Sequence, residues 1–315
     1  MESREKNCPS HSDRGWAWMV LVGACVNSFI LASVGSSFSV LFTEIVSILE
    51  AKKSMIVLIA SLQFGVSLVL GPVFSRLAAE YGYRLVVMTG GMLATGGMCL
   101  SYGAAELRIL IGAYGLLTGM GTGMINTPSK VINGLYFNKK LSLATGLAST
   151  SGAVGALVGP LLCVKLIELY TWHGALIILA GMYLQTVAAS ALFRPIPKAA
   201  KEELCKRRGG YRSLMMPITD MIKLGVHCLN NVAMGFSAFI MVTFWVLYGM
   251  SQGLSFTRAA QMMSVISVSG AVGAFLVAAT GDRPWFPRHV VFVLATLATA
   301  IVAFVFLIAP DAPPA

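Results

Sequence analysis

Charged side chains are scarce in this chain of 315 residues, at 11% of the sequence, whereas hydrophobic residues make up 57% and the mean hydropathy is +0.78. Soluble domains carry about 25% charged and about 45–50% apolar residues. The 23 basic and 13 acidic side chains are too few to cover the surface of a soluble protein of this length. The composition therefore excludes a soluble protein and predicts that lipid surrounds much of the surface.

Sequence patterns that would indicate an enzyme or a metal protein are also missing. The six cysteines form no CxxC pair and no metal-ligand spacing, and four of them fall inside apolar runs, where a small packing role is expected. There are no paired catalytic carboxylates, no Ser/His/Asp arrangement and no glycine-rich nucleotide loop. The chain is therefore predicted not to be an enzyme and to have no catalytic residues, metal site, cofactor or disulfide. No ATP-binding motif is present either, so an ATP-driven mechanism is not supported.

Long apolar runs dominate what is there. A membrane-spanning helix needs about 20 predominantly apolar residues, and nine runs meet that length. They cover residues 16–42, 56–79, 85–105, 109–135, 144–168, 174–193, 221–248, 259–280 and 290–309. The first run is too long for a cleaved signal peptide and has no small-residue cleavage site. The sequence predicts an all-α, polytopic transmembrane helix bundle.

The net charge of +10 does not indicate nucleic acid, because the basic residues stand between apolar runs rather than on one polar face. With the N-terminus in the cytoplasm, sixteen Lys and Arg side chains fall in cytoplasmic segments and five in external ones. Cytoplasmic loops of membrane proteins carry this excess of basic residues. We therefore expect a cytoplasmic N-terminus, the lipid bilayer as a partner, and no nucleic acid.

One long polar segment divides the apolar runs. Residues 1–15 are a cytoplasmic N-terminal tail, 16–193 hold six helices, 194–218 are a basic cytoplasmic linker, 219–309 hold three helices, and 310–315 are a short tail. Six helices, a basic linker and further helices are the organisation of a major-facilitator transporter, whose substrate binds between two six-helix halves. With only three helices of the second six, a C-terminally truncated relative is expected.

Two motifs make a family resemblance more specific. Residues 13–18, Asp-Arg-Gly-Trp-Ala-Trp, resemble the acidic-Gly-Gly-Trp-Gly-Trp signature of the monocarboxylate transporter family (solute carrier 16-like), with Arg14 and Ala17 in place of glycines. Residues 136–140 and 143–148 resemble the second signature of that family, which precedes the fifth helix. The matching positions are Asp13, Gly15, Trp16, Trp18, Tyr136, Phe137, Lys139, Lys140 and Gly146. The tryptophans also suit plain interfacial anchoring, and the two lysines suit contact with anionic lipid.

The resemblance also defines what this chain lacks. Proton-coupled lactate and pyruvate carriers of the family use a lysine in the first helix and an aspartate and an arginine in the eighth. Counted from the motifs, these positions fall at Ser36, Gly270 and Ala274. A carboxylate needs a fixed cation in a low-dielectric cavity, and a coupled proton needs a titratable group. The familiar proton–lactate symport is therefore not expected.

Other polar residues inside the apolar runs are candidates for the substrate pathway. Lys130 is the most informative, because a lysine is costly inside a bilayer, although snorkelling to the cytoplasmic surface is an alternative. His227 and Asn231 share one helix face, and His227 is the titratable group available for proton coupling; interhelical hydrogen bonding is the alternative. The full set of candidates is Asn27, Ser36, Gln63, Asn126, Lys130, His227, Asn230 and Asn231.

Two further groups concern conformational change. Glu80 and Arg84 flank a degenerate form of the charged loop between helices two and three of the superfamily, so they are candidates for a gating loop. Gly155 and Gly159 have the GxxxG spacing that lets two helices approach closely.

The sequence supports two functional hypotheses. The first is a secondary-active or facilitative carrier of a small, monocarboxylate-like solute that works by alternating access in the plasma membrane. The second is a non-transporting truncated isoform or fragment that is degraded or regulates a full-length relative. The resemblance further implies that a single-span immunoglobulin-like glycoprotein is a candidate ancillary partner.

Overall fold

The computed structural model describes residues 15–49, 53–103, 107–137, 140–194 and 256–281, together with the single positions 225, 235, 253, 296 and 297. All regular structure in these ranges is helical, which confirms the all-α class. Apart from these single positions, the expected spans 221–248 and 290–309 and nearly all of the linker 194–218 lie outside the described residues.

The described helices follow the expected apolar runs in order. They are α1 (Trp16–Leu49), α2 (Lys53–Val69), α3 (Gly71–Tyr81), α4 (Tyr83–Tyr102), α5 (Leu107–Leu110), the π-helix η1 (Ile111–Thr118), α6 (Gly119–Tyr136), α7 (Leu141–Ser190) and α10 (Phe256–Thr280). By length and hydropathy, four described helices are able to cross a membrane, or five when α2 and α3 count as one bent span.

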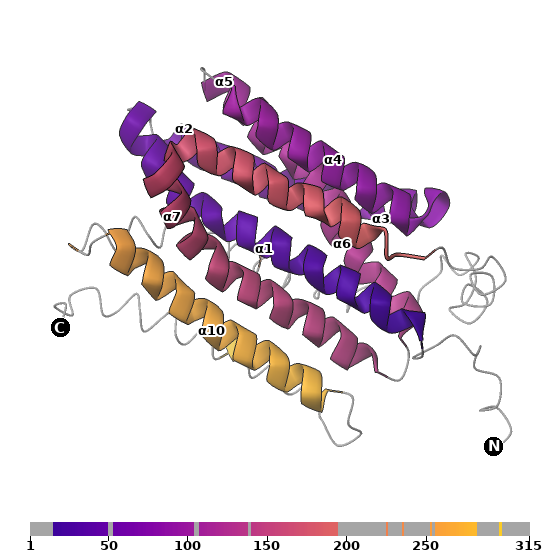
Figure 1. The fold of residues 1–315 in the computed structure, drawn as a ribbon. Helices are drawn as coiled ribbons and strands as arrows, with labels where there is room; N and C mark the ends of the chain where they lie inside the picture. Colours follow the sequence, from indigo (N-terminus) through magenta and orange to yellow (C-terminus); the bar gives the residue numbers. More distant parts are fainter. Residues whose placement is uncertain are drawn as a thin grey trace, which may run out of the picture.

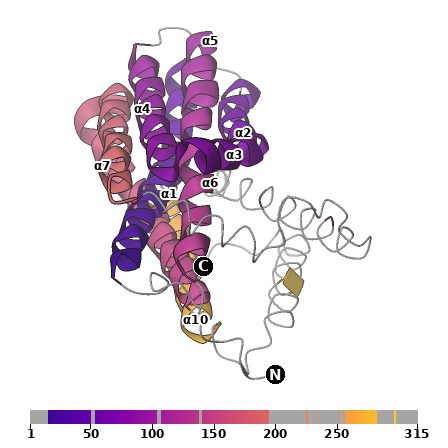
Figure 2. The ribbon, with the colours of Figure 1, turned by 90° about the vertical axis from the view of Figure 1, so that its right-hand side faces the viewer.

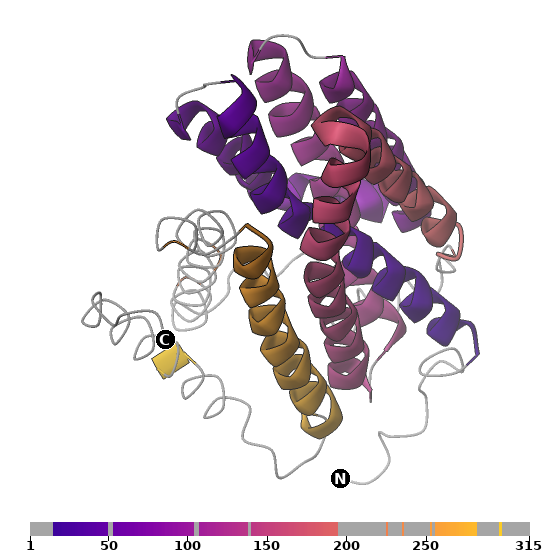
Figure 3. The ribbon, with the colours of Figure 1, turned by 60° about the vertical axis from the view of Figure 1, so that its left-hand side comes forward.

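Helix α7 organises the bundle. Its first part lies between α1 and α10, and its second part returns to pack on α4 (Figures 1 and 3). Helix α6 contacts α1, α2, α3 and α4, and Figure 2 shows it beside α1 and α3. The result is a set of long, roughly aligned helices in which α1 is enclosed by protein along much of its length.

The second expected span, 56–79, is broken. Helices α2 and α3 meet at Leu70 and are bent by 48°. Pro72 lies in the first turn of α3, where its missing N–H group is tolerated. A proline after a glycine, Gly71, therefore divides one apolar run into two helical segments.

The fifth and sixth expected spans form the two arms of α7. They are separated at Thr171, whose backbone angles, φ 62° and ψ 174°, are not helical. This region of backbone space is essentially restricted to glycine. The chain reverses here, and the next residue, Trp172, is buried against the core.

Close backbone contacts hold α7 against α1. An added Cβ at Gly155 would overlap the carbonyl oxygen of Phe29, and one at Gly159 would overlap the carbonyl oxygen of Ser33. Only glycine allows the two helices to come this near, so the GxxxG spacing in the sequence corresponds to a helix–helix contact.

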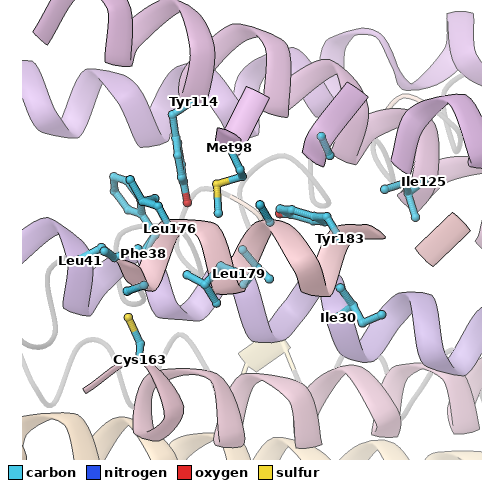
Figure 4. Close-up of a cluster of buried hydrophobic side chains, with 14 of the residues drawn as sticks. Ile30, Phe38, Leu41, Met98, Tyr114, Ile125, Cys163, Leu176, Leu179 and Tyr183 are labelled. Carbon is cyan, nitrogen blue, oxygen red and sulfur yellow. The ribbon is translucent and has the colours of Figure 1, made fainter. Parts of the chain in front are cut away.

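A dry core fills the space between α1, α4, η1 and α7. Figure 4 shows Ile30, Phe38 and Leu41 of α1 facing Leu176 and Leu179 of α7. The rings of Phe38 and Tyr114 lie 5.2 Å apart between centroids. This apolar cluster fixes the helices that form the walls of the cavity described below.

We expect Gly159→Ala to lower the melting temperature of the purified protein by several degrees, because forcing a methyl group into a packed contact costs about 1–3 kcal/mol. Gly181→Ala is the matched control, since an added Cβ there meets nothing within 4 Å. The control should be neutral or slightly stabilising, because alanine favours helix over glycine. Equal melting temperatures for the two variants would contradict close packing at Gly159.

Thr171→Gly should raise the melting temperature, in contrast to Gly159→Ala. The strained backbone at Thr171 costs on the order of 1–3 kcal/mol, and glycine relieves it. Thermal unfolding should therefore show a higher melting temperature than for the unchanged protein. Thr150→Gly, within the regular part of α7, serves as the control and should lower the melting temperature. A loss of stability in both variants would show that Thr171 is not strained.

Candidate functional site

A cavity of about 430 Å³, with several polar side chains in a largely apolar lining, opens in the described part of the bundle. Four helices, α1, α2, α6 and α7, contribute its lining. The lining residues of α1 are Ser28, Leu31, Ala32 and Gly35, which recur at intervals of three and four and so share one helix face. The volume lies within the range of about 300–1,000 Å³ that is usual for small-molecule sites.

Helix α6 supplies the most polar wall. Thr122, Asn126, Lys130 and Asn133 lie on one face of the helix and all line the cavity. The Lys130 side chain is exposed, and no carboxylate among the described residues pairs with it. An ammonium group therefore stands in a mostly neutral cavity, where it attracts an anion.

The structure brings together three of the candidates for the substrate pathway. Gln63 of α2, at 6% exposure, lines the same cavity as Asn126 and Lys130 of α6. Lys130 therefore lies in the cavity wall.

Two other candidates lie outside the cavity lining. Asn27 is fully buried, and its Nδ2 donates a hydrogen bond to Ser129 Oγ at 3.3 Å, which ties α1 to α6. Ser36 is buried and donates to the backbone oxygen of Ser33 at 3.1 Å. The remaining candidates, His227, Asn230 and Asn231, fall outside the described residues.

Several cavity residues were not among the sequence candidates. Asn133 of α6 and Thr145 and Ser149 of α7 all line the cavity, as does Tyr183 from the second arm of α7. The spacing of three from Lys130 to Asn133 was a signal for the first of these. No spacing identifies Tyr183, because it reaches the cavity only through the reversal of the chain at Thr171.

The positions at which the family resemblance implies charges in proton-coupled carriers are also described. Besides Ser36, they are Gly270 and Ala274 of α10. Gly270 is exposed, and Ala274 is half-buried. None of the three lines the described cavity. In the described part of the chain, the fixed cation of the cavity is therefore supplied from α6.

The two family signatures meet in space. The rings of Trp18 and Phe137 lie 5.7 Å apart in an edge-to-face arrangement, and Lys140 Nζ lies 5.8 Å from the centre of the Trp18 ring. Ala17, Leu21, Phe137 and Ala144 form a small buried cluster beside this contact. The start of α1 is thus packed against the connection between α6 and α7.

The same region binds the end of α7. Trp16 Nε1 donates to the backbone oxygen of Leu192 at 3.1 Å, and the Tyr136 hydroxyl donates to that of Arg194 at 2.8 Å. Both acceptors lie just beyond the last residue of α7, so these side chains hold the chain that leaves the helix. The Arg194 guanidinium lies 5.8 Å from the centre of the Trp16 ring. Asp13 and Lys139 of the signatures are outside the described residues.

Glycines also mediate the approach of α10. Gly146 of the second signature lies against Ala278 of α10, where an added Cβ would overlap the alanine. Gly281, at the end of α10, lies in the same way against Ser142 of α7. This contact joins the first part of the chain to the second.

Glu80 and Arg84 flank Gly82, which has a positive φ of 102°. Both side chains are exposed, and the described residues show no ion pair between them. The described cysteines, Cys25, Cys99 and Cys163, are free. No group of three or more potential metal ligands occurs in the described ranges.

Comparisons with known proteins agree with this architecture. Residues 21–314 match the Major Facilitator Superfamily. The chain is 31% identical to monocarboxylate transporter 13 of Bos taurus over 304 residues, which is 96% of this chain and 70% of that relative. It is 38% identical to the Rattus norvegicus form over 184 residues, 58% of this chain and 43% of that one.

A more distant relative extends the likeness. Monocarboxylate transporter 12 of Mus musculus is 26% identical over 292 residues, which cover 84% of this chain and 60% of the relative. The chain thus spans between two fifths and about 70% of the length of these relatives. Signatures in contact, helical architecture and similarity along nearly the whole sequence lead to one conclusion: the chain belongs to the monocarboxylate transporter family of the major facilitator superfamily.

Proposed function

We propose that this membrane protein carries a small organic anion, with one carboxylate, across the bilayer by alternating access. The observation that carries the proposal is the position of Lys130 in the wall of this cavity, without a carboxylate partner among the described residues. The substrate would bind between the half formed by residues 16–193 and the helices of 219–309.

The electrostatics of the cavity support an anionic substrate. Outside water, the attraction between an ammonium group and a carboxylate is several times stronger than in bulk solvent. A charge-assisted hydrogen bond adds to this attraction. The neighbouring amides of Asn126 and Gln63 donate and accept hydrogen bonds, so they suit the other polar groups of a small solute.

The packing supports movement of the first half as one body. The contacts among Trp16, Trp18, Tyr136 and Phe137 tie the start of α1 to the ends of α6 and α7. Helix α10 lies on the other part of the chain and contacts α7 through small residues such as Gly146 and Ala278. We infer that the two parts of the chain rock against each other at this α7–α10 contact.

The proposed coupling differs from proton–lactate symport, because Ser36, Gly270 and Ala274 replace the charges of proton-coupled relatives. Facilitated diffusion or coupling through another group, for which His227 is the candidate, takes its place. We further propose a plasma-membrane location with a cytoplasmic N-terminus, which rests on the distribution of Lys and Arg. An ancillary immunoglobulin-like glycoprotein stays a prediction.

Lys130→Ala should reduce saturable uptake of the carried anion by at least about ten-fold, because loss of a charged hydrogen bond costs about 1.5–3 kcal/mol. Lys130→Arg should retain part of the activity, since the charge remains. Radiolabelled uptake in cells with equal surface protein measures both. Lys165→Ala is the control, because Lys165 is an exposed lysine of α7 outside the cavity lining. Equal uptake in the Lys130→Ala and Lys165→Ala cells would remove Lys130 from the substrate site.

Pyruvate uptake should not rise when the external pH falls from about 7.5 to about 6. The three positions that bear charge in proton-coupled relatives have no titratable side chain here. Radiolabelled pyruvate uptake, corrected for vector cells and for surface protein, gives the answer. A rise at the lower pH would show proton coupling, and its loss in His227→Ala would assign the coupling to that residue.

A further inference from the structure

Two hydroxyl groups on the α7 wall of the cavity, those of Thr145 and Ser149, donate their hydrogen atoms to the helix backbone. Thr145 donates to the backbone oxygens of Leu141 and Ser142, at 2.9 and 3.2 Å. Ser149 donates to the backbone oxygen of Thr145 at 3.0 Å. A hydroxyl has one hydrogen to donate and two lone pairs. Both side chains are exposed in the cavity wall, so they offer a solute only hydrogen-bond acceptors.

Helix α6 repeats this arrangement. Thr122 lines the cavity and donates to the backbone oxygen of Gly119 at 3.0 Å. Asn133 also lines the cavity, and its side-chain oxygen Oδ1 accepts no hydrogen bond from a described residue. This oxygen is covered, so its amide has to turn toward the cavity to receive a donor. A buried acceptor without a partner is costly, which favours a ligand that supplies a donor.

The cavity thus has two chemically different regions. Lys130 only donates hydrogen bonds, whereas the oxygens of Thr122, Thr145 and Ser149 only accept them. A carboxylate satisfies Lys130 but adds only further acceptors near the hydroxyl oxygens. An unsubstituted carboxylate, or a keto acid such as pyruvate, has no hydrogen to donate to those oxygens.

A neutral hydrogen-bond donor on the solute fits the cavity better than a positively charged one. No acidic residue occurs among the described lining residues. An ammonium or guanidinium group would therefore share the cavity with Lys130 and lack a counter-charge. A hydroxyl group supplies a hydrogen without this repulsion. The volume of about 430 Å³ leaves room for a solute larger than three carbons.

We propose that the cavity selects a hydroxylated monocarboxylate, such as a sugar acid, with the carboxylate at Lys130 and hydroxyl groups donating to Thr145 and Ser149. The inference rests on the proposed transport function. It makes Thr145 and Ser149 specificity-determining residues, while Lys130 binds the group common to all carboxylates.

The test compares radiolabelled gluconate, which has several hydroxyl groups, with radiolabelled pyruvate, which has none. Cells express the unchanged chain, Thr145→Val or Ser149→Ala, with surface protein quantified. Thr89→Val is the matched control, because Thr89 is exposed on α4, away from the cavity, and donates to backbone oxygens in the same way. The two cavity variants should each raise KM for gluconate by about five- to ten-fold. In the cavity variants, KM for pyruvate should change less than about two-fold where it is measurable. In Thr89→Val, the uptake of gluconate and the uptake of pyruvate should each change less than about two-fold.

The outcomes separate the inference from the transport function. Uptake of pyruvate equal to or better than that of gluconate, or equal losses for both solutes in the cavity variants, would overturn the inference and leave transport standing. A second measurement is the thermal shift of the purified chain with gluconate. Stabilisation that Thr145→Val and Ser149→Ala reduce, without uptake in cells, would support the site and contradict transport. No uptake of either solute and no thermal shift would overturn both.

Discussion

The contact between α1 and α7 at Gly155 and Gly159 is the constraint on which the rest of the structure depends. Because no side chain separates the backbones there, the faces of the two helices beyond the contact are held at a fixed distance. Ser28 of α1 and Gly152 of α7, one turn away, both line the cavity. The cavity wall is therefore set by two glycines that do not line it.

Much of the fold follows from hydropathy, because lipid requires long apolar helices and these are visible as runs. Lys130 was identifiable for the same reason, since a lysine inside an apolar run is rare. The bend at Leu70 and the π-helix η1 were not predicted, because they depend on local backbone geometry. The reversal near Thr171 was expected from the gap between the runs 144–168 and 174–193, but the backbone angles of Thr171 were not. Tyr183 was missed because its place in the cavity follows from tertiary packing.

Serine and threonine have two structural roles in this molecule. Within α1, Ser36, Ser37 and Ser39 donate to carbonyl oxygens of the preceding turn, which hides their polarity from the surroundings. The same local hydrogen bonds at the cavity leave oxygens that accept and do not donate. The same local hydrogen bond thus lets a hydroxyl group be buried between packed helices at some positions and makes it an acceptor toward a solute at others.

The π-helix η1 affects the direction in which the side chains of the following helix α6 point. It ends at Thr118, whose hydroxyl donates to the backbone oxygen of Ala113, five residues earlier, at 3.2 Å. A wider turn of this kind accommodates an additional residue, and each residue of an α-helix advances the face by about 100°. The direction of Lys130 therefore depends on η1, which ends more than ten residues upstream. If the same residues formed a regular α-helix, the face that carries the lysine would turn away from the cavity without a change in any residue that lines it.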